Sequence, residues 1–109
     1  MPQAGKVTSN SVAGTAVLLI GHRVTLTQVH GINTTGAAAY VQLFDAATAG
    51  AVTPGTTVPD HVLTMAASAS AIDVFSSDGY VFELGVVAVA TTTNTGSTGA
   101  TTHVRLGHF

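Results

Sequence analysis

The chain has 109 residues, of which 7% are charged and 46% are hydrophobic, and its formal net charge is −2. This length suits a single domain, and the sequence has no cysteine, which excludes disulfides, thiolate zinc sites and thiol nucleophiles. Three permanent cations, Lys6, Arg23 and Arg105, are too few for a nucleic-acid role, which depends on neutralising phosphates. The charged fraction lies far below the roughly 25% of an ordinary soluble domain. Because charges keep proteins apart, we expect much of this neutral surface to be covered in an assembly.

The apolar runs of the sequence are short. The longest are Ala16–Ile20 and Val86–Ala90, far below the roughly 18–20 residues that cross a bilayer. The first residues also lack the continuous apolar core of a signal peptide. We therefore predict neither a membrane span nor a secretory leader.

The N-terminal stretch from Met1 to Gly14 is small and polar, with Pro2 and Gly5 as breakers of regular structure. It predicts an extended N-terminal arm over residues 1–14 that packs only when given something to pack against. After it, short runs rich in β-branched residues alternate with turn-forming residues, which is typical of strands. The predicted strands are Thr15–Ile20, Arg23–Ile32, Ala37–Asp45, Val58–Ala66, Ser70–Ser76, Tyr80–Ala90 and His103–Phe109.

Two of these strands flank the polar break Asn33-Thr34-Thr35-Gly36. Apolar runs on both sides of a short loop that contains Gly predict a β-hairpin. The alternation of the first strand breaks at Val29, so we expect a bulge near Gln28–Gly31. The run Tyr80–Ala90 is long and almost continuously apolar, which predicts a central strand.

Longer connections are expected at Ala46–Pro59, which contains the turn dipeptide Pro54-Gly55, and at the Thr- and Gly-rich tract Thr91–Thr102. No stretch has the 3.6-residue period of an amphipathic helix. The chain is therefore predicted to be all-β, an antiparallel β-sandwich or jelly-roll-like barrel of about seven to eight strands. Its single β-sandwich domain covers residues 15–109, after the extended N-terminal arm.

The histidines are the first candidates for chemistry. A zinc site needs three or four converging ligands, yet His103 and His108 are five residues apart and point to opposite faces of one strand. Ordinary surface or edge histidines are the favoured interpretation. Convergence through the fold, such as His22 near His103, and a metal shared on a symmetry axis stay open. The five histidines are His22, His30, His61, His103 and His108.

The acids invite comparison with the carboxylate pair of glycoside hydrolases. Asp45, Asp60 and Asp78 each lie beside turn residues, where Asp is favoured for local hydrogen bonds, so we predict that role instead. Glu83 lies within an apolar run and is expected to pair with Arg23 or Arg105, or to face solvent or a neighbouring subunit. The five acids are Asp45, Asp60, Asp73, Asp78 and Glu83.

Other catalytic patterns are missing from the sequence. It has no Gly-x-Ser-x-Gly nucleophile elbow, and Gly96-Ser97-Thr98-Gly99 lacks the P-loop lysine and spacing. The pairs Tyr40/Phe44 and Tyr80/Phe82 are expected to be core rather than a sugar-stacking platform. We predict no catalytic, cofactor-binding or metal-binding residues, no cofactor, and a protein that is not an enzyme.

One segment resembles a known family. Val29–Asp45, VHGINTTGAAAYVQLFD, resembles the "strand, N-x-x-G, A-x-A-Y-x-K-L-Y-D" core of small virion proteins of tailed bacteriophages. The sequence departs from the family at Gln42, where Lys is frequent, and at Glu83, which has no counterpart. Later matches to the family pattern are Ala49–Pro54, Pro59–Leu63, Val74–Phe75, Gly79-Tyr80, Val87–Thr91 and Thr102–Phe109.

The resemblance implies a β-sandwich virion structural protein, a head decoration or cement protein that binds the outer surface of the major capsid lattice and stabilises the head. It implies the major capsid protein as partner and a homo-oligomer, with a trimer favoured, and neither nucleic acid nor membrane as a partner. The location would be the capsid surface of the virion, after synthesis in the host cytoplasm. The alternatives are a tail, fibre or neck component, a carbohydrate-binding or adhesin-like module that presents Tyr40 or Tyr80, and a small enzyme that joins His61 or His103 to an acid.

Overall fold

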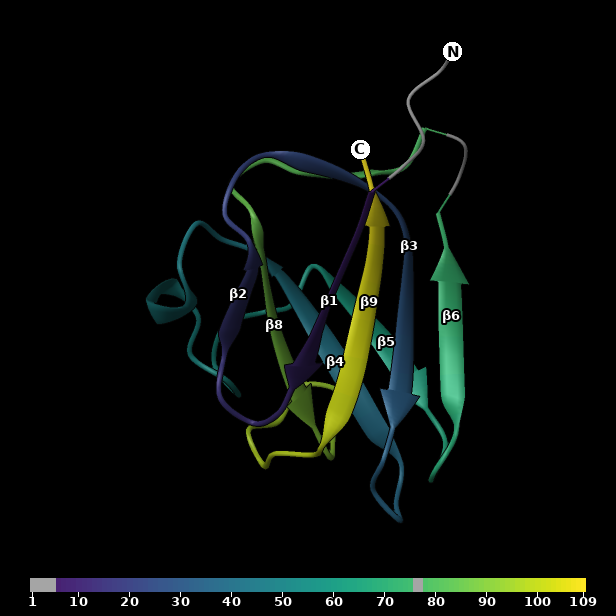
Figure 1. Cartoon of the computed structure of the whole chain (residues 1–109). Coiled ribbons are helices and arrows are strands. Elements are labelled where there is room, and N and C mark those ends of the chain that lie inside the picture. Colours follow the sequence, from purple (N-terminus) through teal and green to yellow (C-terminus); the bar gives the residue numbers. More distant parts are fainter. Residues whose placement is uncertain (1–5, 76–77) are drawn as a thin grey trace.

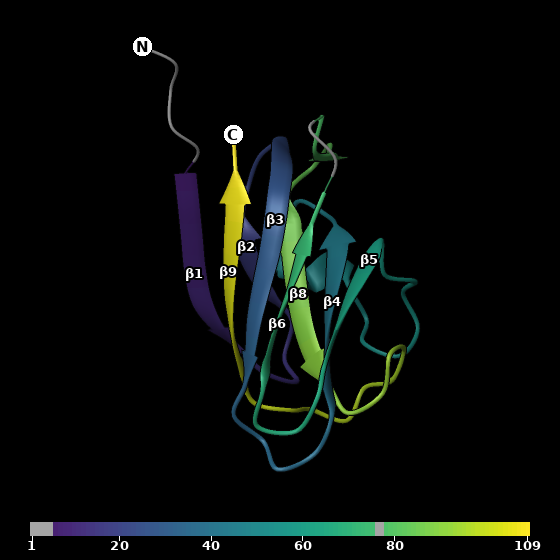
Figure 2. The same cartoon turned by 90° about the vertical axis from the view of Figure 1, so that its right-hand side faces the viewer.

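The computed structural model describes residues 6–75 and 78–109, which form two antiparallel sheets (Figure 1). Figure 2 shows β1, β9 and β3 of sheet A on one side of the molecule and β4 and β5 of sheet B on the other. No helix among the described residues is long and apolar enough to span a membrane. Sheet A contains β1 (Lys6–Val12), β9 (Thr102–His108), β3 (Val24–Asn33), β6 (Ser70–Val74) and β7 (Tyr80–Phe82), and sheet B contains β2 (Val17–Ile20), β8 (Val86–Thr91), β4 (Ala39–Asp45) and β5 (His61–Met65).

The first half of the chain pairs with the second half in reverse order. β1 pairs with β9, β2 with β8, β3 with both β6 and β7, and β4 with β5. These pairs form one long two-stranded ribbon. When the ribbon is wound into two layers, β3 also pairs with β9 and β4 with β8. The resulting order, β1-β9-β3-β6 facing β2-β8-β4-β5, is that of a jelly roll. The predicted antiparallel sandwich is confirmed, although it has nine strands and its sheets do not close into a barrel within the described residues.

The core lies between the sheets and follows the alternation of the strands. Leu26 and Val104 of sheet A and Val41 and Leu63 of sheet B belong to one fully buried apolar cluster. On β8, Val86, Ala88 and Ala90 face this cluster, whereas Val87 and Val89 lie on the opposite side of sheet B. The side chains of β8 therefore alternate between the two faces of sheet B, as the geometry of a strand requires.

The N-terminal arm is where the structure departs first from the sequence analysis. Lys6–Val12 forms β1, which pairs with β9 without a break in register, and Val12 is only 1% exposed. The sequence does not predict this strand because its residues are mostly polar. Polar residues are tolerated here because β1 lies at the edge of sheet A, where Ser9 and Ser11 face solvent. Residues 1–5 of the predicted arm lie outside the described residues.

The predicted hairpin around Asn33-Thr34-Thr35-Gly36 is wrong, because β3 belongs to sheet A and β4 to sheet B. The side chain of Asn33 explains the crossover. Its Nδ2 donates to the carbonyl oxygens of Ala37 and Ala66 at 2.7 and 2.9 Å, while its Oδ1 accepts from the backbone N–H of Thr35 at 2.9 Å. These bonds tie the 34–38 turn to the chain that links β5 to β6, and so direct β4 into the other layer.

The single long strand predicted over Tyr80–Ala90 is divided into β7 and β8, which lie in different sheets. Gly85 stands at the crossover with a φ of 150°, and a Cβ there would lie 2.4 Å from the carbonyl oxygen of Ile20. No side chain fits so close to backbone. The apolar run continues across the break because both strands face the same core.

A conservative substitution tests whether β1 belongs to the folded domain. Val12→Ala removes two buried methyl groups and should lower the free energy of unfolding by about 2 kcal/mol. Chemical denaturation monitored by circular dichroism measures this change. Val7→Ala, on the same strand but 59% exposed, is the matched control and should leave stability unchanged. Equal stability of both variants would mean that the segment is a detached arm.

Candidate functional site

Within the described residues, His61 is the histidine that forms an ion pair with an acid, and the positions of the others are as follows. His22 lies just before β3, whereas His103 pairs with Ile32 at the other end of that strand, so the two do not converge. His108 points inward, with Nε2 2.9 Å from the hydroxyl oxygen of Thr8. Among the described residues, no group of three or more metal-ligating side chains comes together.

The remaining histidine forms an acid–imidazole pair. Nε2 of His61 on β5 lies 2.8 Å from Oδ2 of Asp73 on β6, so the pair bridges the two sheets at their open edge. The ring of Phe75 meets the imidazole edge-on, with ring centroids 5.1 Å apart. A carboxylate that orients an imidazole is one part of a catalytic triad, but no hydroxyl of the described residues is hydrogen-bonded to His61. The pair therefore ties β5 to β6 and presents no assembled nucleophile.

The core prediction for the two aromatic pairs is confirmed for Phe44 and Phe82 but is wrong for Tyr80, which is exposed. Phe44 and Phe82 are completely buried, and the ring of Tyr80 lies between those of Phe75 and Phe82, with centroid distances of 5.6 and 5.2 Å. Tyr80 is 37% exposed, while Tyr40 is half-buried on sheet B. The two tyrosines lie in different sheets and do not form one platform.

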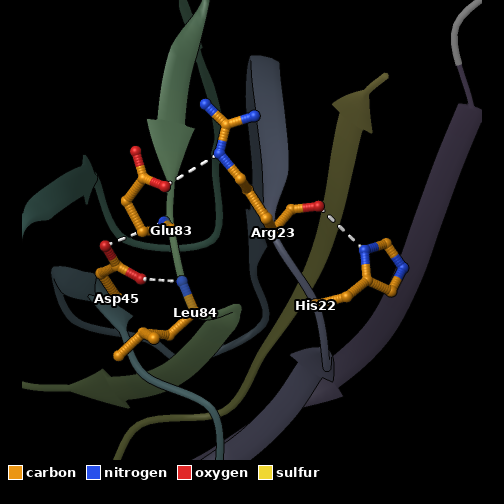
Figure 3. A network of polar contacts seen from close by, with 5 residues as sticks. All are labelled: His22, Arg23, Asp45, Glu83 and Leu84. Carbon is orange, nitrogen blue, oxygen red and sulfur yellow. Dashed lines mark hydrogen bonds and ion pairs between the residues drawn. The ribbon is translucent and has the colours of Figure 1, made fainter.

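Asp45 is the centre of a polar network at the β7–β8 crossover (Figure 3). Its carboxylate accepts hydrogen bonds from the backbone N–H of Glu83 at 3.0 Å and of Leu84 at 2.8 Å. Its own N–H donates to the carboxylate of Asp60 at 2.7 Å. We expected local turn bonds for these aspartates, but the structure uses them to join distant segments. Arg23 Nε lies 2.8 Å from Glu83 Oε2, which is one of the two ion pairs predicted for that glutamate.

The outer face of sheet B is covered by the chain's own loops (Figure 2). Val52, from the 46–60 connection, packs with Phe44, Val87 and Val89. Gln42 Nε2 donates to the hydroxyl oxygen of Thr91 at 2.7 Å and to the carbonyl oxygen of Gly96 at 3.2 Å, which holds the 92–98 loop over the sheet. Gln42 is fully buried. A lysine at this position, which is frequent in the phage virion proteins that Val29–Asp45 resembles, would bury a charged ammonium group at a high cost in free energy.

The outer face of sheet A carries six exposed apolar side chains, and we call this surface face A. Strand alternation and the register place all of them on the side that points away from sheet B. Their exposed fractions lie between 37% and 72%. Several exposed apolar side chains on one face of a protein are typical of an interaction site. The six residues are Val7 on β1, Ile32 on β3, Ile72 and Val74 on β6, Val81 on β7, and Phe109 after β9.

The centre of face A is basic and lacks acids. Arg105 on β9 is directly opposite His30 on β3, and His103 lies two residues before Arg105 on the same face. Asp73 is the acid on a sheet A strand, but its register partner is the buried Val29, so it points inward toward His61. Arg105 is therefore the one permanent charge among the described side chains at outward strand positions of face A.

The sequence alone indicates two of the side chains of face A as a pair on one side of a strand, but not that this side is exposed. The alternation of β6 puts Ile72 and Val74 on one side of the strand and Asp73 and Phe75 on the other. Either side qualifies as the inward one when the strand is read alone. Only the register with β3 shows that the aliphatic side faces solvent.

Comparison with known proteins adds little beyond the fold. No family model matches the chain, and none of the curated proteins does. The chain is similar to a crystal structure of PirA, with 10% identity over 96% of both chains and a TM-score of 0.44. It is also similar to a protein from the study of Bacillus endospore appendages, a novel family of disulfide-linked pili, with 10% identity over 96% of this chain and 91% of that one and a TM-score of 0.37. Likenesses at this level carry no argument about function.

Substitution of Asp45 tests whether the carboxylate network is structural. Asp45→Ala removes the acceptor of two exposed backbone N–H groups at the β7–β8 crossover and should lower the free energy of unfolding by about 1 kcal/mol. Glu83→Ala removes only an ion pair whose two side chains are 64% and 65% exposed, so its effect should stay within about 0.5 kcal/mol. Thermal and urea unfolding of both variants measure the difference. A larger loss for Glu83→Ala would contradict the assignment.

Proposed function

We propose that this protein is a virion structural protein, a decoration or cement protein that binds the outer surface of a capsid lattice through face A and stabilises the head. The observation that carries the proposal is the contrast between the two outer faces of the sandwich. Loops of the chain itself cover sheet B, whereas the apolar surface of sheet A has no cover among the described residues. The family resemblance of Val29–Asp45 supplies the class of partner, the major capsid protein.

The energetics of face A favour binding by several copies together. Burying a partly exposed Val, Ile or Phe contributes on the order of 1 kcal/mol, so six such side chains contribute several kcal/mol. Association costs about 4–15 kcal/mol in lost translational and rotational freedom, which leaves one face with weak affinity. Linked copies overcome this limit, since each further contact is then intramolecular. This arithmetic supports the proposed homo-oligomer, for which the resemblance favours a trimer.

The low charge of the chain also suits a covered surface. Three permanent cations and five acids among 109 residues give little electrostatic steering. Binding then depends on apolar contact and on shape, and should respond only weakly to salt. Such a contact fits a static lattice better than a freely diffusing partner that must be found quickly.

The copy number in assembled particles tests the location. Quantitative mass spectrometry of purified virions, from the virus whose genome encodes the chain, should find hundreds of copies for each particle if the protein decorates the head lattice. A handful of copies would place it in the tail, fibre or neck, and complete absence from particles would overturn the virion assignment.

Substitutions on face A test the binding surface. The double variant Ile72→Asp/Val74→Asp puts two charges into the apolar patch and should lower occupancy on capsids at least tenfold, because desolvating an unpaired carboxylate is costly. Occupancy is measured by densitometry of washed particles after incubation with purified protein. Val58→Asp is the control, because Val58 is 82% exposed but lies in the loop before β5, away from face A. Equal loss for both variants would exclude face A as the specific contact.

A further inference from the structure

We propose that the centre of face A is a carboxylate-binding cluster, formed by His30, His103 and Arg105, which receives an Asp or Glu side chain of the partner protein. This inference rests on the proposed function, because it specifies the chemistry of the surface that covers face A. The inference adds the chemical group of the partner and the residues of this chain that recognise that group.

The sheet register brings the three side chains together. His30 on β3 is directly opposite Arg105 on β9, and the Cβ atoms of directly opposite residues lie about 4.5–5.5 Å apart. His103 is two residues before Arg105 on the same face of β9, a distance of about 7 Å along the strand. The three side chains therefore project from neighbouring positions on one face of sheet A. Ser9 and Ser11 on β1, opposite Arg105 and His103, border the cluster with hydroxyl groups.

The cluster has no counter-charge in the part of the chain that the structure describes. Arg23 and His61 each have a carboxylate oxygen at 2.8 Å, but Arg105 forms no ion pair among the described residues. Arg105 is a permanent cation, and the imidazole of His30 directly opposite it can also donate a hydrogen bond to an anion. An anion between the two strands would therefore meet donors from both β3 and β9.

A carboxylate is the anion that fits best. The guanidinium group presents two parallel N–H donors that match the two oxygens of a carboxylate, and each imidazole adds at least one donor. The surrounding aliphatic side chains, among them Ile32 and Ile72, exclude water when covered and so strengthen the ion pair. A phosphate is a poorer match, because one permanent charge is a weak basis for binding a polyanion.

A second copy of the chain is a poor occupant of face A. Two such faces packed against each other would bring two Arg105 guanidinium groups into one interface, and like charges in apposition are unfavourable. The cluster thus selects a different protein, whose surface is apolar around a single acid.

Nuclear magnetic resonance of the histidine rings tests the cluster in the isolated full chain, without the capsid. Sodium acetate is titrated at constant ionic strength, with sodium chloride as the exchanged salt. We expect saturable shifts of the His30 and His103 ring signals, while His22 and His61 serve as references that do not saturate. Arg105→Gln should weaken the apparent affinity for acetate at least threefold, whereas Arg23→Gln, the matched control, should not change it.

Other outcomes would overturn the inference. Shifts of all exposed histidines together, or no change in Arg105→Gln, would mean unspecific screening. Saturation with inorganic phosphate but not with acetate would make this a phosphate site, and a dimer abolished by Ile72→Asp/Val74→Asp in sedimentation would make the occupant a second copy. None of these results depends on capsid occupancy, so failure of the cluster and failure of the proposed function are distinguishable.

Discussion

Each sheet of a sandwich has two faces, and the opposite sheet can bury only one of them. The remaining face must be polar, be covered by other parts of the chain, or meet another molecule. This protein uses two different solutions. Val52 and the 92–98 loop cover sheet B, whereas sheet A keeps aliphatic and aromatic side chains on its outer face. The division of the molecule into a self-covered side and an open side is the basis for every functional proposal made above.

Polar side chains in this chain mainly determine topology. The jelly-roll order requires the backbone to cross between the sheets several times, and each crossing leaves backbone donors and acceptors without a ladder partner. Asn33 satisfies such groups between β3 and β4, and Asp45 does so between β7 and β8. Asp45, which the sequence offers as a candidate catalytic carboxylate, thus has a structural role at the crossover between the two sheets.

The sequence predicted strands better than it predicted their partners. Period-two alternation and the spacing of turn residues identified most strands, because both are local properties of the sequence. The pairing of β3 with β9, which lies about 75 residues further along the chain, has no local signal. The same limit explains the incorrect hairpin, since the break at Asn33 looks identical whether the chain returns in the same sheet or crosses to the other. It also explains why β1 was missed, because its polar edge residues carry no alternation of their own.

The candidate surface was hidden for a related reason. The alternation of β6 does not show which of its sides faces the core, and only the position of Ile72 and Val74 opposite His30 and Gln28 places them outside. A neutral, apolar face of this kind is prone to pair with copies of itself, and a charge in its middle is a known protection against that. Arg105 occupies this position. Under the proposed function, the guanidinium group of Arg105 has two effects. It opposes self-association of face A, and it favours a partner that brings a carboxylate. One residue thus contributes to both solubility and specificity.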